Sequence, residues 1–311
     1  MTTDQVTYVV FGVVLLIAIT FDLGLLSKRS ATVSIKAALL QTLFWITLAF
    51  AFGVFLWFEK GQTIALEYIS AYLMEWSLSI DNIFVFILIF GFFNIEESHV
   101  ARALLIGILM AIIFRIIFIT VGVWLVDNFH WVLYIFGAFL VFTGVRIFTV
   151  RQEDDFDPAK NPVYKFINRF FPIIHEDVGG KFTVVKDGKR FYTNMFLVIV
   201  LLATTDIVFA LDSIPAVFAI SQDKLVIYTS NIFAVLGLRS LFFLLKGAIS
   251  KFEYLQQGIA IVLVFIGIKM LVEPWFKVPI YISLMVIVIC LLGSMYYSIR
   301  VLNKRNKKIL P

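Results

Sequence analysis

The sequence predicts an all-α membrane protein, a polytopic bundle of about nine transmembrane helices that forms one domain over residues 1–311. Three observations predict this fold class: an apolar composition, a series of apolar runs of membrane-spanning length, and an internal repeat. Of the 311 residues, 61% are hydrophobic and only 15% are charged, whereas soluble domains carry about 25% charged residues. This composition excludes an ordinary soluble domain.

The apolar runs define the predicted helices, because a stretch of about 20 apolar residues crosses a bilayer as a helix. They cover residues 5–26, 37–58, 64–93, 103–126, 131–150, 193–220, 225–247, 257–273 and 279–302. The third run is too long for one straight span, so its first turns are expected to lie at the membrane surface or to begin a broken helix. The first run follows "MTTDQ", which lacks the basic residues of a signal peptide, and is interpreted as a retained helix.

The distribution of basic residues predicts the orientation. Segments on the N-terminal side of the membrane contribute only Lys60, Lys224 and Lys277, while most of the 26 Lys and Arg residues fall on the other side. Lys and Arg are retained in cytoplasmic loops. We therefore expect a multi-pass protein of the cell inner (plasma) membrane with its N-terminus outside and its C-terminus in the cytoplasm. The net charge of +5 then belongs to the loops and gives no indication of nucleic-acid binding.

The one long hydrophilic loop, residues 151–192, is cytoplasmic in this topology. Its segment "NPVYKFINRFF" is expected to form a short amphipathic helix on the membrane, and "KFTVVKDGKRFYT" to form a hairpin that turns at Asp187 and Gly188. His175, Glu176 and Asp177 are a weak candidate metal site, because three adjacent residues seldom converge on one ion. A solvated turn is the favoured interpretation of these three residues.

An internal repeat locates the predicted core. "LVFTGVR" at 140–146 matches "LVFIGIK" at 263–269, and the acidic motif "EWSLSIDN" at 75–82 matches "TDIVFALDSIPA" at 205–216. The repeats are expected to span residues 64–150 and 193–273, with three helices in each. An odd number of crossings inverts the second copy, and inverted repeats are typical of secondary transporters whose substrates bind near the midplane.

The two motifs place oxygen ligands at membrane depth, where carboxylates usually mark ion paths, proton relays or ion pairs. The candidate metal ligands are Asp81, Asp212, Asn82, Ser213, Glu75 and Asp206. Such ligands suit Mg²⁺, Ca²⁺ or Mn²⁺, and the three histidines all lie in predicted loops. Pro215 is expected to break its helix and to free backbone oxygens beside Asp212.

Basic residues inside the runs determine how much of the acidic charge is compensated. Arg115 and Arg239 are central and are expected to balance charge, whereas Arg146 and Lys269 lie near the ends of their spans, where long side chains reach water. Four acids against two arginines leave an excess of negative charge that suits a divalent cation. The alternative is that the acids only form ion pairs with these basic residues.

At the two acidic motifs, and in the intervening "GGKFTVVKDGKRFYTNMFLVIVLLATTD", the sequence resembles the TerC family of membrane proteins, named for tellurium resistance. The resemblance covers roughly residues 5–300 and includes the Alx-type manganese exporters, related to the LysE-type superfamily. It implies Mn²⁺ export and assigns the acidic motif positions to the six candidate ligands above. One departure is Thr205, where the family commonly has Glu.

The leading hypothesis is therefore a transporter that exports Mn²⁺ by alternating access, with Asp81 and Asp212 as direct ligands, no organic cofactor and no enzymatic activity. The lipid bilayer and the transported dication are its expected partners; the sequence does not predict an oligomeric state. An intramembrane aspartyl protease is disfavoured because a GxGD motif is missing. The remaining alternative is a membrane anchor for a metal-stress or tellurite-stress complex, with residues 151–192 as the docking surface.

Overall fold

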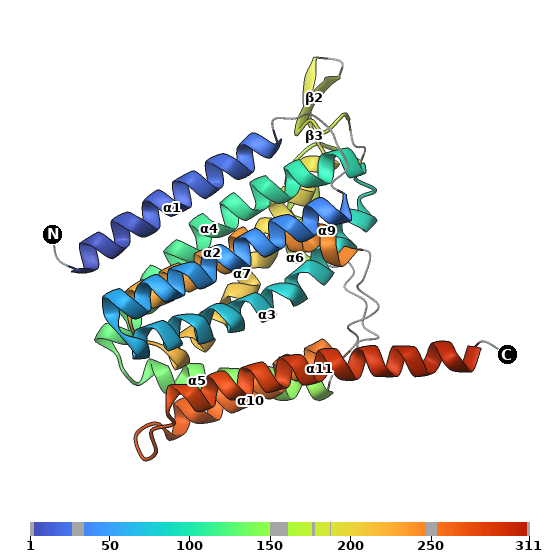
Figure 1. Ribbon diagram of the computed structural model, residues 1–311. Coiled ribbons are helices and arrows are strands. Elements are labelled where there is room, and N and C mark those ends of the chain that lie inside the picture. Colours follow the sequence, from blue (N-terminus) through green and yellow to red (C-terminus); the bar gives the residue numbers. More distant parts are fainter. Residues whose placement is uncertain are drawn as a thin grey trace.

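The computed structural model has the helical architecture that the sequence predicts. It describes residues 3–26, 34–149, 161–175, 178–186, 188–246 and 254–309. This part of the chain contains eleven helices and one small sheet. The long helices lie side by side along a common direction, and the sheet projects from one end of the bundle (Figure 1).

The predicted apolar runs each coincide with one helix, or with the pair α8 and α9. The helices are α1 (Thr3–Leu26), α2 (Ile35–Lys60), α3 (Gln62–Phe92), α4 (Glu97–Asn128), α5 (Val132–Thr149), α6 (Pro162–Phe170), α7 (Asn194–Ile220), α8 (Lys224–Leu236), α9 (Leu238–Lys246), α10 (Leu255–Val272) and α11 (Ile280–Ile309). Six described helices are long and apolar enough to cross a membrane, or seven if the bent α8–α9 pair forms one span. A multi-pass bundle is confirmed, whereas nine crossings remain a prediction.

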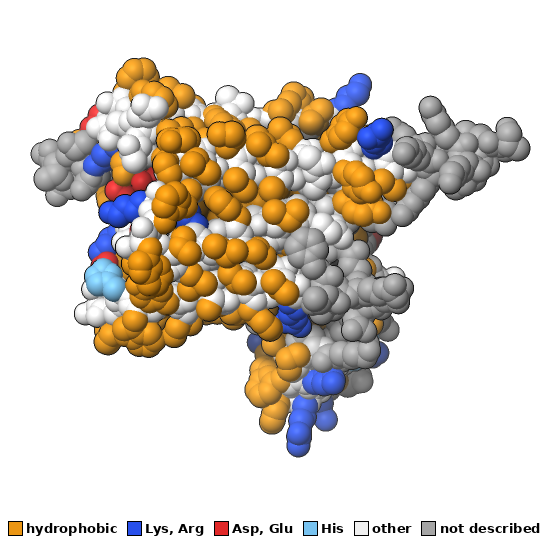
Figure 2. Space-filling view, turned by 90° about the horizontal axis from the view of Figure 1, so that it is seen from below, with side chains coloured by type: hydrophobic (Ala, Val, Ile, Leu, Met, Phe, Trp, Pro, Cys, Tyr) orange, Lys and Arg blue, Asp and Glu red, His pale blue; other side chains and the backbone are white. Residues whose placement is uncertain are grey.

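The outer surface of the bundle is apolar. Phe58 and Leu40 are 84% and 68% exposed, and Figure 2 shows a face largely covered by hydrophobic side chains, with Lys and Arg gathered toward its edges. Contiguous apolar surface of this extent is unfavourable in water and marks contact with a membrane or a partner. Together with the helix lengths, it identifies the long helices as membrane-embedded.

The expectation that Pro215 breaks its helix is wrong, and so is the alternative that the third run begins a broken helix; that its first turns lie at the membrane surface stays a prediction. Both α3 and α7 are continuous, and α7 runs through Pro215 to Ile220. A proline removes only one hydrogen bond from the ladder, and membrane helices tolerate this loss where neighbouring helices surround the freed carbonyl. A break occurs instead at Gly237, where the helix axis bends by 40° between α8 and α9.

The loop between α5 and α7 contains the predicted amphipathic helix and hairpin. Helix α6 begins after Asn161, whose side chain accepts a hydrogen bond from the backbone N–H of Val163 at 2.8 Å. Strands β2 (Thr183–Lys186) and β3 (Lys189–Thr193) pair antiparallel, and β1 (Ile173–Ile174) pairs parallel with β3. Gly188 has a φ of +73°, which suits the hairpin turn. Asp187, Glu176 and Asp177 lie outside the described residues.

Helices α3 and α7 run antiparallel. At the sheet end, Asn194 Nδ2 at the start of α7 donates to the carbonyl oxygen of Phe93 after α3, at 3.1 Å. At the far end, Ser221 Oγ after α7 donates to Glu67 near the start of α3. These helices are the first of each predicted repeat, so opposite directions are what an inverted repeat requires. The repeat itself remains a prediction.

Glycines bring α5 and α10 into backbone contact. A Cβ added at Gly267 would lie 2.7 Å from the Gly137 carbonyl oxygen, and a Cβ added at Gly144 would lie 2.8 Å from that of Ala260. Small residues permit such close approach of membrane helices. When "LVFTGVR" is aligned with "LVFIGIK", Gly144 corresponds to Gly267 and Gly137 corresponds to Ala260. The Gly267–Gly137 contact therefore corresponds to the Gly144–Ala260 contact, as a two-fold relation between the repeats predicts.

The contact of α5 and α10 at Gly137, Gly144 and Gly267, here called the glycine seam, is so close that one added methyl group is expected to lower the stability of the protein. Gly267→Ala should lower the free energy of unfolding by about 1–3 kcal/mol, the usual cost of overpacking. Gly293→Ala in α11 is the matched control, because a Cβ there meets nothing within 4 Å. Thermal unfolding in detergent compares the two variants; equal transition temperatures would contradict the account of the seam.

Candidate functional site

A buried ionic cluster joins α3, α4, α7 and α8 inside the bundle. Arg115 on α4 donates from Nε and Nη2 to the two carboxylate oxygens of Asp206, at 2.9 and 3.1 Å. Its Nη1 donates to Glu75 Oε2 at 2.8 Å and to Asn231 Oδ1 at 3.0 Å. Asn231 Nδ2 in turn donates to Glu75 Oε1 at 2.7 Å. Arg115 and Asp206 are each 1% exposed, and Glu75 and Asn231 are fully buried.

The charges within this cluster do not balance. Two carboxylates share one guanidinium, so the cluster carries one net negative charge when both acids are ionised. An uncompensated charge is costly at membrane depth and is ordinarily neutralised by a proton or a cation. The arrangement therefore favours a site that responds to protons or metal ions over a balanced structural ion pair.

The local sequence explains why Arg115 reaches both acids. Gly107 lies two turns before it on α4, and a Cβ there would approach Leu202 of α7 to 3.2 Å, so the two helices are in close contact at this level. The planar guanidinium then meets the Asp206 carboxylate in a two-pronged pair, which lysine cannot form. Arg115 thus lies where a charge-balancing residue is predicted.

Asp212 lies outside the ionic cluster. It accepts a hydrogen bond from Thr143 Oγ1 of α5 at 3.3 Å, and the charge of Arg146 on the same helix attracts it. Arg146 is exposed, as expected near the end of a span, and its charge also acts on Asp212. The six-residue spacing between Asp206 and Asp212 sends their side chains in different directions around α7, about 120° apart for 100° per residue.

The other predicted site residues are buried, with one exception that is not described. Asn82 is 2% exposed, and Ser213 is 1% exposed and near enough to the Glu75 carboxyl to influence it without a well-formed hydrogen bond. Arg239 is buried in α9. Asp81 belongs to α3, but its side chain lies outside the described residues. The structure thus unites Glu75, Asp206 and Arg115, and places Asp212 beside α5.

Unpaired hydroxyl groups mark the two acidic motifs. Ser79, Thr205 and Ser213 each have a buried hydroxyl oxygen with no hydrogen-bond partner among the described residues. A buried polar atom without a partner costs about 1–3 kcal/mol, and such atoms in native proteins ordinarily bind water or an ion. No group of three His, Cys, Asp or Glu residues in the described part of the chain could hold a metal; the Asp81 side chain falls outside that search.

Two polar contacts were not predicted from the sequence. Asn231 completes the ionic cluster and Thr143 bonds Asp212. The only signal for Asn231 is an amide in the middle of an apolar run, eight residues before Arg239. Thr143 carries no such signal, because a threonine in a membrane helix usually bonds its own backbone.

The fold and this site define a multi-pass integral membrane protein with charged groups buried between its helices. The family described as "Integral membrane protein TerC family" matches residues 60–308, and the chain belongs to that family.

Its relatives cover nearly the whole chain. An "Uncharacterized membrane protein STKORF319" of Myxococcus xanthus is 42% identical over 86% of this chain and 84% of its own length. A membrane protein of Rickettsia bellii is 38% identical, with 94% and 97% covered. The "Putative membrane-bound redox modulator Alx" of Escherichia coli K12 is 39% identical, with 89% of each chain covered. No solved structure matches the chain.

Proposed function

We propose that this protein is a divalent cation transporter of the inner membrane that exports Mn²⁺ from the cytoplasm by alternating access, with its N-terminus outside. The observation that carries the proposal is the buried ionic cluster, in which Glu75 and Asp206 share the single guanidinium of Arg115. Its excess negative charge, enclosed among membrane-embedded helices, attracts a cation or a proton. A transporter that exchanges a dication for protons uses both.

The proposal assigns different roles to the acids. Asp212 and Asp81 bind the ion directly, with Ser213 and Asn82 as neutral oxygen ligands. Glu75 and Asp206 already bind Arg115, so they act from beside the ion by setting the local charge. Ser213 is suited to link the two sets, because it follows Asp212 in the chain and its unpaired hydroxyl is near Glu75. Oxygen ligands suit a hard dication; the choice of Mn²⁺ rests on the resemblance to the Alx-type exporters.

The alternatives are less well supported. The printed name of the Escherichia coli relative describes a redox modulator, but this chain has a single cysteine, Cys290, and an intrachain thiol–disulfide couple needs two. An enzymatic role is not proposed. A membrane anchor without transport of its own would use the sheet and α6, but nothing in the buried cluster serves that role.

Flux measurements test the proposal. The purified chain in proteoliposomes should transport Mn²⁺, and Asp212→Asn should reduce the rate by about tenfold or more, because a neutral amide removes about 1.4 kcal/mol or more of ion stabilisation. The matched control is Asp127→Asn, an exposed acid that pairs with Lys224 at 2.8 Å. Transport that survives Asp212→Asn removes the ligand assignment. A well-folded wild-type chain that moves no divalent ion favours the anchor.

A further inference from the structure

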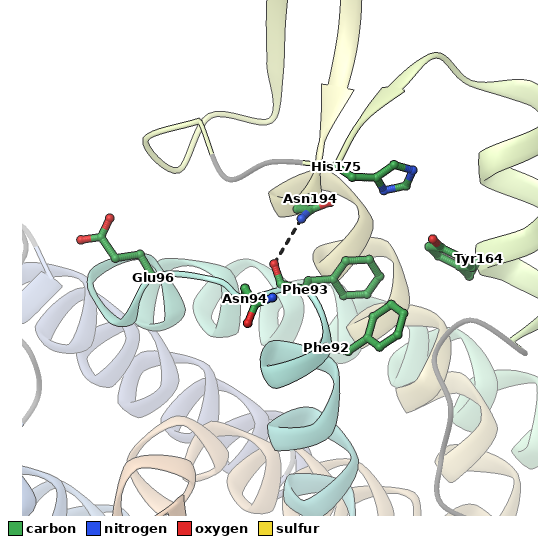
Figure 3. Close-up of a pocket in the computed structure, with 7 residues that line it drawn as sticks. All are labelled: Phe92, Phe93, Asn94, Glu96, Tyr164, His175 and Asn194. Atoms are coloured by element: carbon green, nitrogen blue, oxygen red, sulfur yellow. Dashed lines mark hydrogen bonds between the residues drawn. The ribbon is translucent and has the colours of Figure 1, made fainter.

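Helix α6 packs on the bundle through one of its sides. The ring centroid of Tyr164 lies 5.8 Å from that of Phe93 and 6.3 Å from that of Phe92, and Figure 3 shows Tyr164 beside these two phenylalanines at the end of α3. Ile167 on the same helix is buried, with 4% of its surface exposed. These contacts hold α6 beside the last turn of α3. The short helix therefore lies at the level where a membrane-embedded helix ends.

A second side of α6 carries two exposed phenylalanines. Phe166 and Phe170 are 59% and 63% exposed, and their ring centroids lie 4.7 Å apart. Residues four apart are neighbours on a helix surface, so the two rings form one continuous patch. Phe171, which follows α6, has its ring centroid 6.4 Å from that of Phe196 in the first turn of α7. The aromatic surface thus continues to the start of a second membrane-embedded helix.

A third side of α6 is basic. Lys165 and Arg169 are both exposed, and the helix contains no acidic residue. At 100° per residue, the order around the helix is Ile167, then the two phenylalanines, then the two basic residues. Arg169 lies beside the aromatic patch, because its Cζ is 5.9 Å from the centroid of the Phe170 ring. Positive charge and exposed aromatic surface are therefore adjacent on one short helix.

This combination suits the boundary between a bilayer and water. Amphipathic helices lie in that boundary with apolar and aromatic side chains toward the acyl chains and with Lys or Arg at the headgroups. A pair of neighbouring phenylalanines exposed to water is unfavourable, and contact with acyl chains removes the pair from water. The basic residues then lie at the depth of the lipid phosphates, to which arginine can donate two parallel hydrogen bonds.

We propose that α6 is a binding site for an anionic phospholipid, with Phe166 and Phe170 against the acyl chains and Lys165 and Arg169 on the headgroup. The positive charge of α6 attracts an anionic headgroup more strongly than a zwitterionic one, whose ammonium group it repels. A soluble acidic protein would use the basic residues but would leave the phenylalanines in water, whereas a lipid contacts both. In the proposed topology the site faces the cytoplasmic leaflet, whose surface is negatively charged. It is independent of what the bundle transports.

Native mass spectrometry of the detergent-solubilised chain, titrated with phosphatidylglycerol, gives the dissociation constant of the first bound lipid. Each Lys or Arg near an anionic surface strengthens binding about fivefold. The double variant Lys165→Gln with Arg169→Gln should therefore raise the dissociation constant by about 25-fold. The matched control is Lys186→Gln with Lys189→Gln, which removes the same charge from two exposed residues of the hairpin and should leave the constant unchanged. Zwitterionic phosphatidylcholine should bind the wild type more weakly, and the α6 variant should bind both lipids about equally.

The outcomes that would overturn the lipid site are distinct. An unchanged dissociation constant in the α6 variant would overturn it, and so would an equal loss in the hairpin control, because net charge alone would then explain the effect. Phe166→Ser tests the aromatic half of the site and should weaken phosphatidylglycerol binding by about tenfold. A dimer that Phe166→Ser dissociates in the absence of lipid would instead assign the patch to a second copy of the chain. None of these measurements involves ion flux, so a failure of Mn²⁺ transport would refute only the proposed function.

Discussion

Replacing Arg115 by methionine is expected to destabilise the protein by about 3–5 kcal/mol, the usual cost of removing one partner from a buried ion pair. The substitution leaves the carboxylates of Glu75 and Asp206 facing each other without a cation. It also removes the donors that occupy three of their four oxygen atoms. The protein would then have to protonate both acids or open the bundle to water.

Thermal unfolding in detergent measures this effect. Lys246→Met is the matched control, because it removes a basic residue from an exposed pair with Glu97, and exposed pairs contribute little. Adding Asp206→Asn to Arg115→Met should recover part of the lost stability, since one of the two unpaired charges disappears. A transition temperature that barely moves in Arg115→Met would show that the cluster is not a structural element of the folded state.

Glu75→Gln is expected to separate stability from transport. The variant keeps the shape of the side chain and leaves one carboxylate with one guanidinium, so the cluster becomes neutral. One hydrogen bond, that from Asn231 Nδ2, is lost at a cost of about 1 kcal/mol. Flux of Mn²⁺ should fall by about tenfold or more, because the excess charge that attracts a cation or proton is gone.

The comparison of Glu75→Gln with Arg115→Met is the informative one. A structural ion pair would make both variants unstable, whereas a charge-setting cluster makes the arginine variant unstable and the glutamine variant inactive. Glu97→Gln, an exposed acid at the start of α4, is the control for flux. Wild-type flux in folded Glu75→Gln would contradict the role assigned to the net charge.

The fold could be predicted largely from the sequence because its strongest signal is simple. Runs of apolar residues mark the helices, and the alternation around Asp187 and Gly188 marks the hairpin. The continuity of α3 and α7 and the bend at Gly237 could not be predicted in this way. Whether a proline or a glycine interrupts a helix depends on which neighbours stabilise the freed carbonyl groups, and that information lies in the packing.

The site could be predicted only in part, for a related reason. Polar residues in apolar runs predict that Glu75 and Asp206 belong to a site at membrane depth and that Arg115 balances charge there, with ion pairing only as the alternative. The sequence does not give the rotation of each helix about its axis, so it could not show that one arginine takes both acids or that Asp212 turns toward Thr143. Asn231 was missed because an amide carries no charge to balance.

The glycine seam between α5 and α10 limits how this bundle can rearrange. The backbones of these two helices are in contact at the glycines, and the side chains of Val141, Val264 and Leu271 pack closely around these contacts. We therefore expect α5 and α10 to move together as one rigid pair that joins the two predicted repeats. A motion that separates the two predicted repeats between α5 and α10 would have to break this contact. Any transport cycle that exposes the buried acids alternately to each side of the membrane is therefore expected to keep α5 and α10 together and to tilt the remaining helices against this pair.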